Sequence, residues 1–269
     1  MTAPLITSRH NPRLKEAAKL RDARERRRTG RFLVDGARET LRALAAGAEP
    51  VEAFVSEGLD DALTTEALAE LERRSTPLSP VAPEAFAKLA YGQRETGLVL
   101  VATAPKRSLG DLKLPADPLV VVLEGVEKPG NLGAILRTAD GAGVDAVVVA
   151  DPRTDLMNPN TIRASVGAVF KQNIAVATTE ETIAWLAGRG LRTLVTRPEA
   201  AERYDRTDLA GGVALVLGSE AHGLSDAWER SALKLTALSL PMAGVADSLN
   251  VSAAAAVLLY EARRQRDAV

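Results

Sequence analysis

The chain has 269 residues, 46% of them hydrophobic and 26% charged, which is typical of a globular protein with two domains of moderate size. Lys and Arg number 34 and Asp and Glu 35, so a net charge of −1 gives no overall attraction to nucleic acid or to a membrane. The absence of Cys excludes disulfides, thiolate metal sites and a cysteine nucleophile, and two His are too few for a histidine-rich metal centre.

Residues 1–104 are predicted to form a small α/β module. Asn11 before Pro12 is a typical helix start, because the first caps the helix and the second fits its first turn. This basic helix is expected to run to about Arg28 and to end near Gly30. Further strands are predicted at 31–34, 51–56 and 97–103, and further helices at 37–46, 64–74 and 83–90.

Basic charge gathers at the start of this module. Residues 1–44 hold 12 Lys and Arg against 5 Asp and Glu, so the local balance is 12 − 5 = +7. Such a segment suits a polyphosphate backbone, and its candidate RNA contacts are Arg24, Arg27 and Arg28. The alternative is a solvated helix face on which Asp22 and Glu25 pair with these arginines. Only 3% of the residues are aromatic, which argues against recognition dominated by base stacking.

The second domain is predicted at residues 118–269. Three prolines, a glycine and no regular hydrophobic period in 104–118 predict a linker over 105–117. Strands of the second domain are expected at 119–123, 145–150, 174–177, 191–196, 213–217 and 237–240, and helices at 131–141, 160–169, 179–187 and 248–264. Apolar strands separated by helices indicate a mostly parallel sheet covered on both faces.

Three glycine-containing loops of this domain follow strands, and ligands of open parallel sheets bind at the carboxyl ends of strands. The first loop holds Asn131, which is expected to cap the next helix. Arg137 has apolar neighbours in the sequence, so we expect it to be partly buried and to bind a carboxylate or a phosphate. The glycine spacing matches neither a dinucleotide fingerprint nor a Walker loop.

The second loop places Ser219 and Glu220 between glycines, which indicates a backbone that approaches a ligand closely. Glu220 is a candidate partner for Arg137. Ser219 lacks the surroundings of a hydrolase nucleophile, and His222 has no second histidine nearby with which to hold a metal.

The third loop leads from the strand at 237–240 into the last helix. Either Ser248 or Asn250 can cap this helix, and Ser248 is the expected cap. Helix starts also present free N–H groups, so capping and ligand binding are compatible.

These three loops resemble those of the SpoU–TrmH family of RNA ribose 2′-O-methyltransferases, in the SPOUT superfamily. The matching segments read PGNLGAILRTA, LGSEAHGLS and LPMAGVADSLNVSAAAA, and the resemblance extends from about Pro118 to the C-terminus. NPRLKEAAKL and GRFLVDGARETL look like the small substrate-binding domain often attached in front of this catalytic domain. The resemblance implies an α/β domain with a trefoil knot, S-adenosylmethionine as methyl donor, and a homodimer in which Arg137 lies near the partner's cofactor.

The resemblance also implies roles for single residues. The polar motif positions that the resemblance marks as catalytic are Asn131, Arg137, Glu220, Ser248 and Asn250. Cofactor contacts, largely through the main chain, fall on Thr196, Leu217, Gly218, Leu240, Met242 and Leu249. We expect Arg137 to bind the target phosphate and 2′-oxygen, and the resemblance implies that it also assists deprotonation. The expected roles of the others are to position Arg137 and the ribose and, for Asn250, to brace the third loop.

RNA is the expected substrate, because only RNA offers a ribose 2′-hydroxyl. Ribosomal RNA is favoured because the first module resembles those of rRNA-directed members. The alternatives are a tRNA methyltransferase, a non-catalytic RNA- or ribosome-binding protein of the same fold and, more distantly, a nicotinamide- or nucleotide-dependent enzyme. Arg163 and Lys171 are candidates for a wider RNA contact, with surface solvation as the alternative. No apolar stretch reaches the ~20 residues of a membrane helix and residues 1–13 lack a signal-peptide core, so a cytoplasmic protein without membrane or metal partners is predicted.

Overall fold

The structure is a computed structural model that describes residues 3–58, 61–89, 97–171 and 173–268. The chain forms two compact units. Unit 1 comprises residues 1–106 and 155–171, and unit 2 comprises residues 107–154 and 172–269. Residues 155–171, expected in the second domain, thus group with the first, and the chain passes between the units three times.

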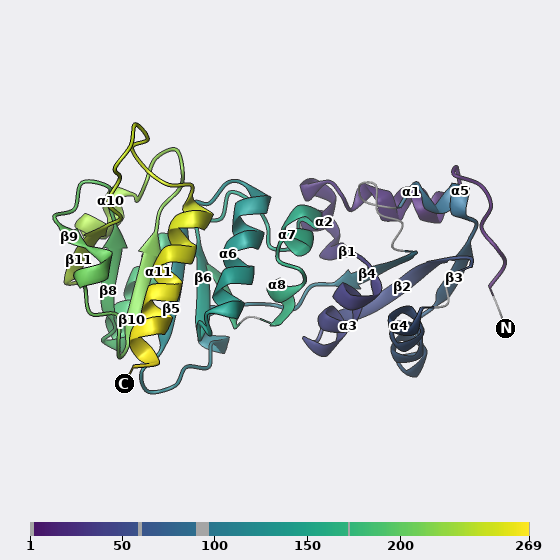
Figure 1. Cartoon of the computed structure of the whole chain (residues 1–269). Helices are drawn as coiled ribbons and strands as arrows, with labels where there is room; N and C mark the ends of the chain where they lie inside the picture. The colour runs from purple at the N-terminus through teal and green to yellow at the C-terminus, as the bar shows by residue number, and fades with distance from the viewer. Residues whose placement is uncertain (1–2, 59–60, 90–96, 172, 269) are drawn as a thin grey trace. The chain divides into compact units, whose positions relative to one another are not determined.

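Unit 1 has, within the described residues, a four-stranded sheet in the order β1-β4-β2-β3 (Figure 1). Its strands are β1 (Arg31–Asp35), β2 (Glu49–Ser56), β3 (Leu78–Val81) and β4 (Leu98–Thr103). Its helices are α1 (Pro12–Lys19), α2 (Ala23–Thr29), α3 (Ala37–Ala45), α4 (Ala62–Arg73), α5 (Pro83–Phe86), α7 (Pro159–Ala164) and α8 (Ala168–Lys171). β4 is antiparallel to both neighbours and β3 is parallel to β2. The short β3, which contains Pro80, was not predicted because four residues carry little periodic signal.

Two predicted helices of unit 1 are interrupted in the structure. The basic helix is split into α1 and α2, because the Asp22 carboxylate accepts a hydrogen bond from the Arg24 N–H at 2.7 Å and starts a new helix there. Asn11 caps α1 as predicted. The helix expected at 160–169 breaks where Val166 and Gly167 adopt φ angles of 52° and 77°.

Unit 2 has, over its described part, a seven-stranded sheet in the order β7-β6-β5-β10-β8-β11-β9, in which every pairing is parallel. The strands are β5 (Leu119–Glu124), β6 (Ala146–Ala150), β7 (Ile174–Ala177), β8 (Arg192–Thr196), β9 (Glu202–Arg203), β10 (Val213–Leu217) and β11 (Leu235–Ser239). The helices are α6 (Pro129–Gly141), α9 (Thr179–Arg189), α10 (Asp226–Glu229) and α11 (Val251–Arg266), with 3-10 turns η1 (Leu109–Asp111) and η2 (Tyr204–Arg206). The predicted α/β class with a mostly parallel sheet is confirmed.

Helices cover both faces of the unit 2 sheet. Leu186 of α9 and Trp228 of α10 pack on the face that carries Val120. Helices α6 and α11 pack together on the other face (Figure 1). Side chains of a strand alternate between faces, so strands that are buried on both faces need apolar residues on both, as β10 and the first five residues of β5 have. No helix in the described ranges is both long and apolar enough to cross a bilayer.

Most of the predicted linker packs on unit 2, which begins at residue 107. Ser108 and Asp111 form a capping box around η1, in which the carboxylate accepts the Ser108 N–H at 3.1 Å and hydroxyl at 2.5 Å. Leu112 is buried in the core beneath the sheet. Desolvation lowers the pKa of the Arg107 guanidinium to about 10, so this partly buried group stays charged at neutral pH.

Candidate active site

A pocket of about 370 Å³ lies where the loops after β8, β10 and β11 meet the start of α11. These strands are parallel, so their carboxyl ends share one edge of the sheet. All the predicted cofactor residues line the pocket: Thr196, Leu217, Gly218, Leu240, Met242 and Leu249. Three of the predicted catalytic residues, Glu220, Ser248 and Asn250, also line it.

The pocket has an apolar floor and a more exposed rim. Leu217 and Leu238 are buried, whereas Met242 and Leu249 are 36% and 40% exposed. The Thr196 hydroxyl donates to the Val216 carbonyl at 3.1 Å and ties the end of β8 to β10. A pocket of this size, lined by both apolar and polar side chains, can hold a small molecule. Among the described residues, no group of three His, Asp or Glu side chains is placed to hold a metal ion.

A chain of hydrogen bonds joins the three loops at the rim. Asn131 Nδ2 donates to the Glu220 carboxylate. Asn250 Nδ2 donates to Asn131 Oδ1 at 3.4 Å, and Asn250 Oδ1 accepts the Ser252 N–H at 2.9 Å and hydroxyl at 2.6 Å. Asn131 therefore links the second loop to the third through both ends of its amide.

Two of the predicted helix caps are wrong. α6 begins at Pro129, and Lys128 at the N-cap position makes no side-chain capping bond, so Asn131 lies in the first turn and its amide is available to Glu220. Proline fits the first helical position, and this moves the start of α6 ahead of Asn131. α11 begins at Val251 and is capped by Asn250, whereas Ser248 is an exposed loop residue.

The predicted burial of Arg137 is wrong. It is exposed on α6 rather than partly buried, and it does not line the pocket. Six residues along a helix correspond to a rotation of about 240°, which turns Arg137 away from Asn131. Glu220, its expected partner, bonds Asn131 instead. Within the described part of the chain, the guanidinium of Arg137 has no hydrogen-bond or ion-pair partner.

Gly218 is required by the backbone of its own loop. A Cβ there would lie 2.2 Å from the carbonyl carbon of Gly223. Reciprocal backbone hydrogen bonds of 3.0 Å between Ser219 and Gly223 fix this approach, and Gly223 has a φ of 65°. Gly218 and Gly223 thus close the loop on itself, and both line the pocket, so the close approach of this backbone to a ligand stays a prediction.

Glu124 is a buried carboxylate that the sequence reasoning missed. It accepts hydrogen bonds from the Thr179 hydroxyl at 2.7 Å and from the Ser225 N–H and hydroxyl at 2.8 and 2.7 Å. It thereby fixes the end of β5 to the residue that follows the second loop. An acid at the end of an otherwise apolar strand was the available signal. Further pocket residues that were not predicted include Lys128, Arg197 and Asp247.

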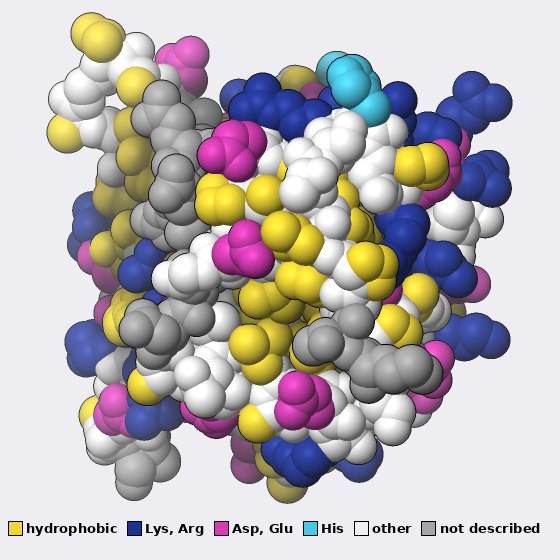
Figure 2. All heavy atoms as spheres, turned by 90° about the vertical axis from the view of Figure 1, so that its right-hand side faces the viewer, with side chains coloured by type: hydrophobic (Ala, Val, Ile, Leu, Met, Phe, Trp, Pro, Cys, Tyr) yellow, Lys and Arg dark blue, Asp and Glu magenta, His cyan; other side chains and the backbone are white. Residues whose placement is uncertain are grey.

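The candidate RNA contacts of α2 divide into two kinds. Arg24 and Arg27 are exposed and have no ion-pair partner among the described residues. Arg28 pairs with Glu25 at 2.8 Å, and this hydrogen bond raises the pKa of Arg28 and lowers that of Glu25. On the face of unit 1 in Figure 2, basic side chains lie around the margin, mixed with acidic ones, rather than in one continuous patch.

Arg26, in the same run, is structural. It is 5% exposed and donates to Asp155 at 2.6 Å and to the carbonyl oxygens of Leu20 and Arg21. This ion pair holds the start of segment 155–171 in unit 1. Arg163, on α7 of that segment, is exposed, and the side chain of Lys171 lies outside the described residues.

The fold and the pocket define an α/β protein that binds a small molecule at the carboxyl edge of a parallel sheet. Residues 118–260 match the SpoU rRNA Methylase family, and residues 11–99 match the MRM3-like substrate binding domain. The first match spans more than half of the chain, and the chain belongs to the SpoU rRNA Methylase family.

Known proteins resemble the chain over most of its length. It is 35% identical to the 23S rRNA (guanosine-2′-O-)-methyltransferase RlmB of Pectobacterium atrosepticum, over 80% of this chain and 90% of that protein. It is 32% identical to the 23S rRNA (uridine(2479)-2′-O)-methyltransferase of Streptomyces viridochromogenes, over 97% and 92%. The AdoMet-bound rRNA methyltransferase structure from Sinorhizobium meliloti superposes with a TM-score of 0.86 at 28% identity, over 97% of this chain and 98% of that one.

Proposed function

We propose that the protein transfers a methyl group from S-adenosylmethionine to a ribose 2′-hydroxyl of ribosomal RNA. The observation that carries this proposal is the hydrogen-bonded chain from Glu220 through Asn131 to Asn250 at the rim of the pocket. Membership of the SpoU rRNA Methylase family supports it, as do the named activities of the two curated relatives.

The residues of the pocket fit this methyl donor. Leu217, Leu240 and Leu249 offer apolar surface to a flat ring, and the loop backbone at Gly218 offers polar main-chain groups. S-adenosylmethionine, when bound, supplies an activated methyl group. The protein must then hold the ribose oxygen in line with that methyl group, and orientation of this kind supplies ~7–11 kcal/mol of a barrier.

In this proposal, the polar residues at the rim position the ribose and the third loop. Asn131, Glu220 and Ser248 orient the ribose, and Asn250 braces the third loop through its bonds to Ser252. Arg137 binds the phosphate and 2′-oxygen of the target nucleotide and stabilises the oxygen as its proton leaves, since a guanidinium is a permanent cation with several donors.

The proposal places Arg137 in the pocket of a second copy of the chain. Its exposure on α6, outside its own pocket, supports a trans role. Helix α11, which packs beside α6, exposes Tyr260 by 54% and Val257 by 36%, apolar surface that a two-fold interface would cover.

The proposal includes a trefoil knot and a cytoplasmic location. The chain returns from β10 to β11 on the far side of β8, and loop 240–250 then lies beside loop 217–220 in the pocket, an arrangement that supports threading. A ribosomal RNA substrate and the lack of Cys support the location.

The direct test is methyl transfer from labelled S-adenosylmethionine to ribosomal RNA and to tRNA, both isolated from cells that lack the protein. We expect label in ribosomal RNA as a 2′-O-methylnucleotide at one mapped position. Label in tRNA alone would replace the proposed substrate, and RNA binding without transfer would support the non-catalytic alternative. Mapping also identifies the base, which is guanosine for one relative and uridine for the other.

We expect Gly218→Ala to weaken binding of S-adenosylmethionine by about ten- to a hundredfold, because forcing apart a packed contact costs ~1–3 kcal/mol. The added methyl group meets the backbone of Gly223 and must open the second loop. Calorimetric titration measures the affinity. Gly188→Ala is the matched control, because its Cβ meets nothing within 4 Å; equal affinities for both variants would contradict the packing argument.

A further inference from the structure

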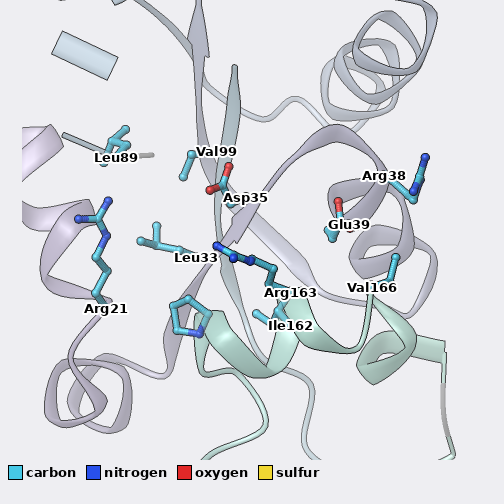
Figure 3. A pocket seen from close by; sticks show the side chains of 11 residues that line it. Arg21, Leu33, Asp35, Arg38, Glu39, Leu89, Val99, Ile162, Arg163 and Val166 are labelled. Carbon is cyan, nitrogen blue, oxygen red and sulfur yellow. The ribbon is translucent and has the colours of Figure 1, made fainter. Parts of the chain in front are cut away.

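Unit 1 has a smaller hollow, which the proposed reaction does not use. It has a volume of about 110 Å³ and lies between β1, β4 and α7 (Figure 3). Leu33 and Val99 line it from the sheet, and Ile162 lines it from the segment 155–171. This segment falls within the match to the SpoU rRNA Methylase family, whereas the sheet falls within the match to the substrate binding domain, so neither matched region forms the hollow alone.

The size of the hollow limits what it can hold. Apolar cavities of about 150 Å³ accept a benzene molecule. The hollow, at about 110 Å³, is of the same order and is open on one side. Because it is smaller than that cavity but open, it has room for only the six-membered ring of a purine, whose fused five-membered ring stays at the opening, and it is too small for a whole nucleotide.

Acceptor groups line the hollow beside its apolar wall. The carboxylates are those of Asp35, at the end of β1, and Glu39, on α3. Ionised carboxylates only accept hydrogen bonds, and each has about four lone-pair sites. Guanine presents two neighbouring donors, N1–H and the 2-amino group, on one edge. Adenine and cytosine place a ring acceptor beside their single amino group, so a carboxylate repels part of that edge.

Two arginines can bind the RNA phosphates next to a base held in the hollow. Arg38 and Arg163 both line the hollow and are exposed, and within the described ranges neither guanidinium has a hydrogen-bond or ion-pair partner. Arg163 extends from α7 toward Leu33 and Asp35 (Figure 3). Phosphate contacts of this kind give affinity without sequence preference.

No phenylalanine ring on the described surface of unit 1 is available for a base to stack on. Phe32, Phe54, Phe86 and Phe170 are all buried, with exposed fractions between 0% and 4%. Single-stranded RNA is otherwise read by splayed bases that stack on aromatic rings or guanidinium planes.

We propose that the hollow of unit 1 binds one unpaired guanine base of the RNA substrate, with Asp35 and Glu39 accepting its Watson–Crick donors and Arg38 and Arg163 contacting the adjacent phosphates. The proposal rests on RNA being the substrate.

Binding of short RNA by the full-length protein tests this. The probes are fluorescein-labelled heptamers UUUGUUU and UUUAUUU, titrated without S-adenosylmethionine and followed by anisotropy. We expect the guanosine heptamer to bind about tenfold more tightly, since a well-placed pair of hydrogen bonds discriminates against a base that lacks one of the two donors. Inosine, which lacks the 2-amino group, should lose most of the preference, and 7-deazaguanosine should keep it.

Single-residue variants test which side chains contact the base and which contact the phosphates. Glu39→Gln should remove the preference for guanosine, whereas the exposed Glu66→Gln on α4 should keep it. Arg163→Ala should weaken both heptamers alike and lower the salt dependence of log Kd by about one unit, the loss of one phosphate contact. The matched control is Arg73→Ala, another exposed arginine of unit 1.

Equal affinity of the wild-type protein for the guanosine, adenosine and inosine heptamers would overturn the inference without any variant. Persistence of the preference in Glu39→Gln would also overturn the assigned contact. Because binding is measured without the methyl donor, this result is independent of methyl transfer. Active methylation with no base preference leaves the proposed function standing and removes only the guanine site.

Discussion

Arg137→Ala is expected to lower the rate of methyl transfer to ribosomal RNA by about 10²–10³-fold, the usual loss when one donor to a developing charge is removed. The affinity for S-adenosylmethionine is expected to stay within about twofold of wild type, because Arg137 is exposed on α6 and does not line the cofactor pocket of its own chain. Single-turnover methylation and calorimetric titration of the same preparation measure the two effects separately.

Two further variants sharpen this experiment. Arg137→Lys keeps the positive charge but loses the planar guanidinium and its set of N–H donors, so we expect a rate of methyl transfer between those of wild type and Arg137→Ala. Arg230→Ala removes another exposed arginine of unit 2 and serves as the matched control. Wild-type turnover in Arg137→Ala would remove this residue from the reaction, whereas a parallel loss of cofactor affinity would show that it acts on the pocket.

The parallel sheet and its loops could be predicted because their signals are local. β10 and the first five residues of β5 are apolar at successive positions, a pattern typical of a strand buried on both faces. The loops after β8, β10 and β11 then had to share one edge, which is why residues as distant in sequence as Thr196 and Leu249 line one pocket. The order of the strands did not follow from these patterns.

The structure departs from the sequence patterns at features that depend on tertiary partners. Segment 155–171 packs in unit 1 partly through the pair of Arg26 and Asp155, which are 129 positions apart, and no local pattern marks such a pair. Asn131 is of a residue type that often caps helices, but α6 already begins at Pro129, ahead of Asn131. Arg137 was expected to be partly buried because its sequence neighbours are apolar, yet on a helix those neighbours face inward while it faces outward.

A heterodimer of two inactive variants is expected to recover about half of the wild-type turnover per dimer, because a two-fold dimer then has one intact site of two. One chain carries Arg137→Ala and keeps its pocket. The other carries Glu220→Ala and Ser248→Ala and keeps Arg137. If Arg137 acts in the partner's pocket, the first chain's pocket receives an intact arginine, whereas the second chain's site lacks both elements.

The two chains are co-expressed with different affinity tags, and the heterodimer is isolated by two successive purifications and assayed for methyl transfer. Homodimers of each variant, carrying both tags in the same way, provide the background. If Arg137 serves its own pocket, the heterodimer contains no intact site and stays at that background. Failure of any doubly tagged species to form would contradict the dimer itself. Recovery therefore requires both the trans position of Arg137, which its exposure on α6 supports, and an interface that pairs two copies of the chain.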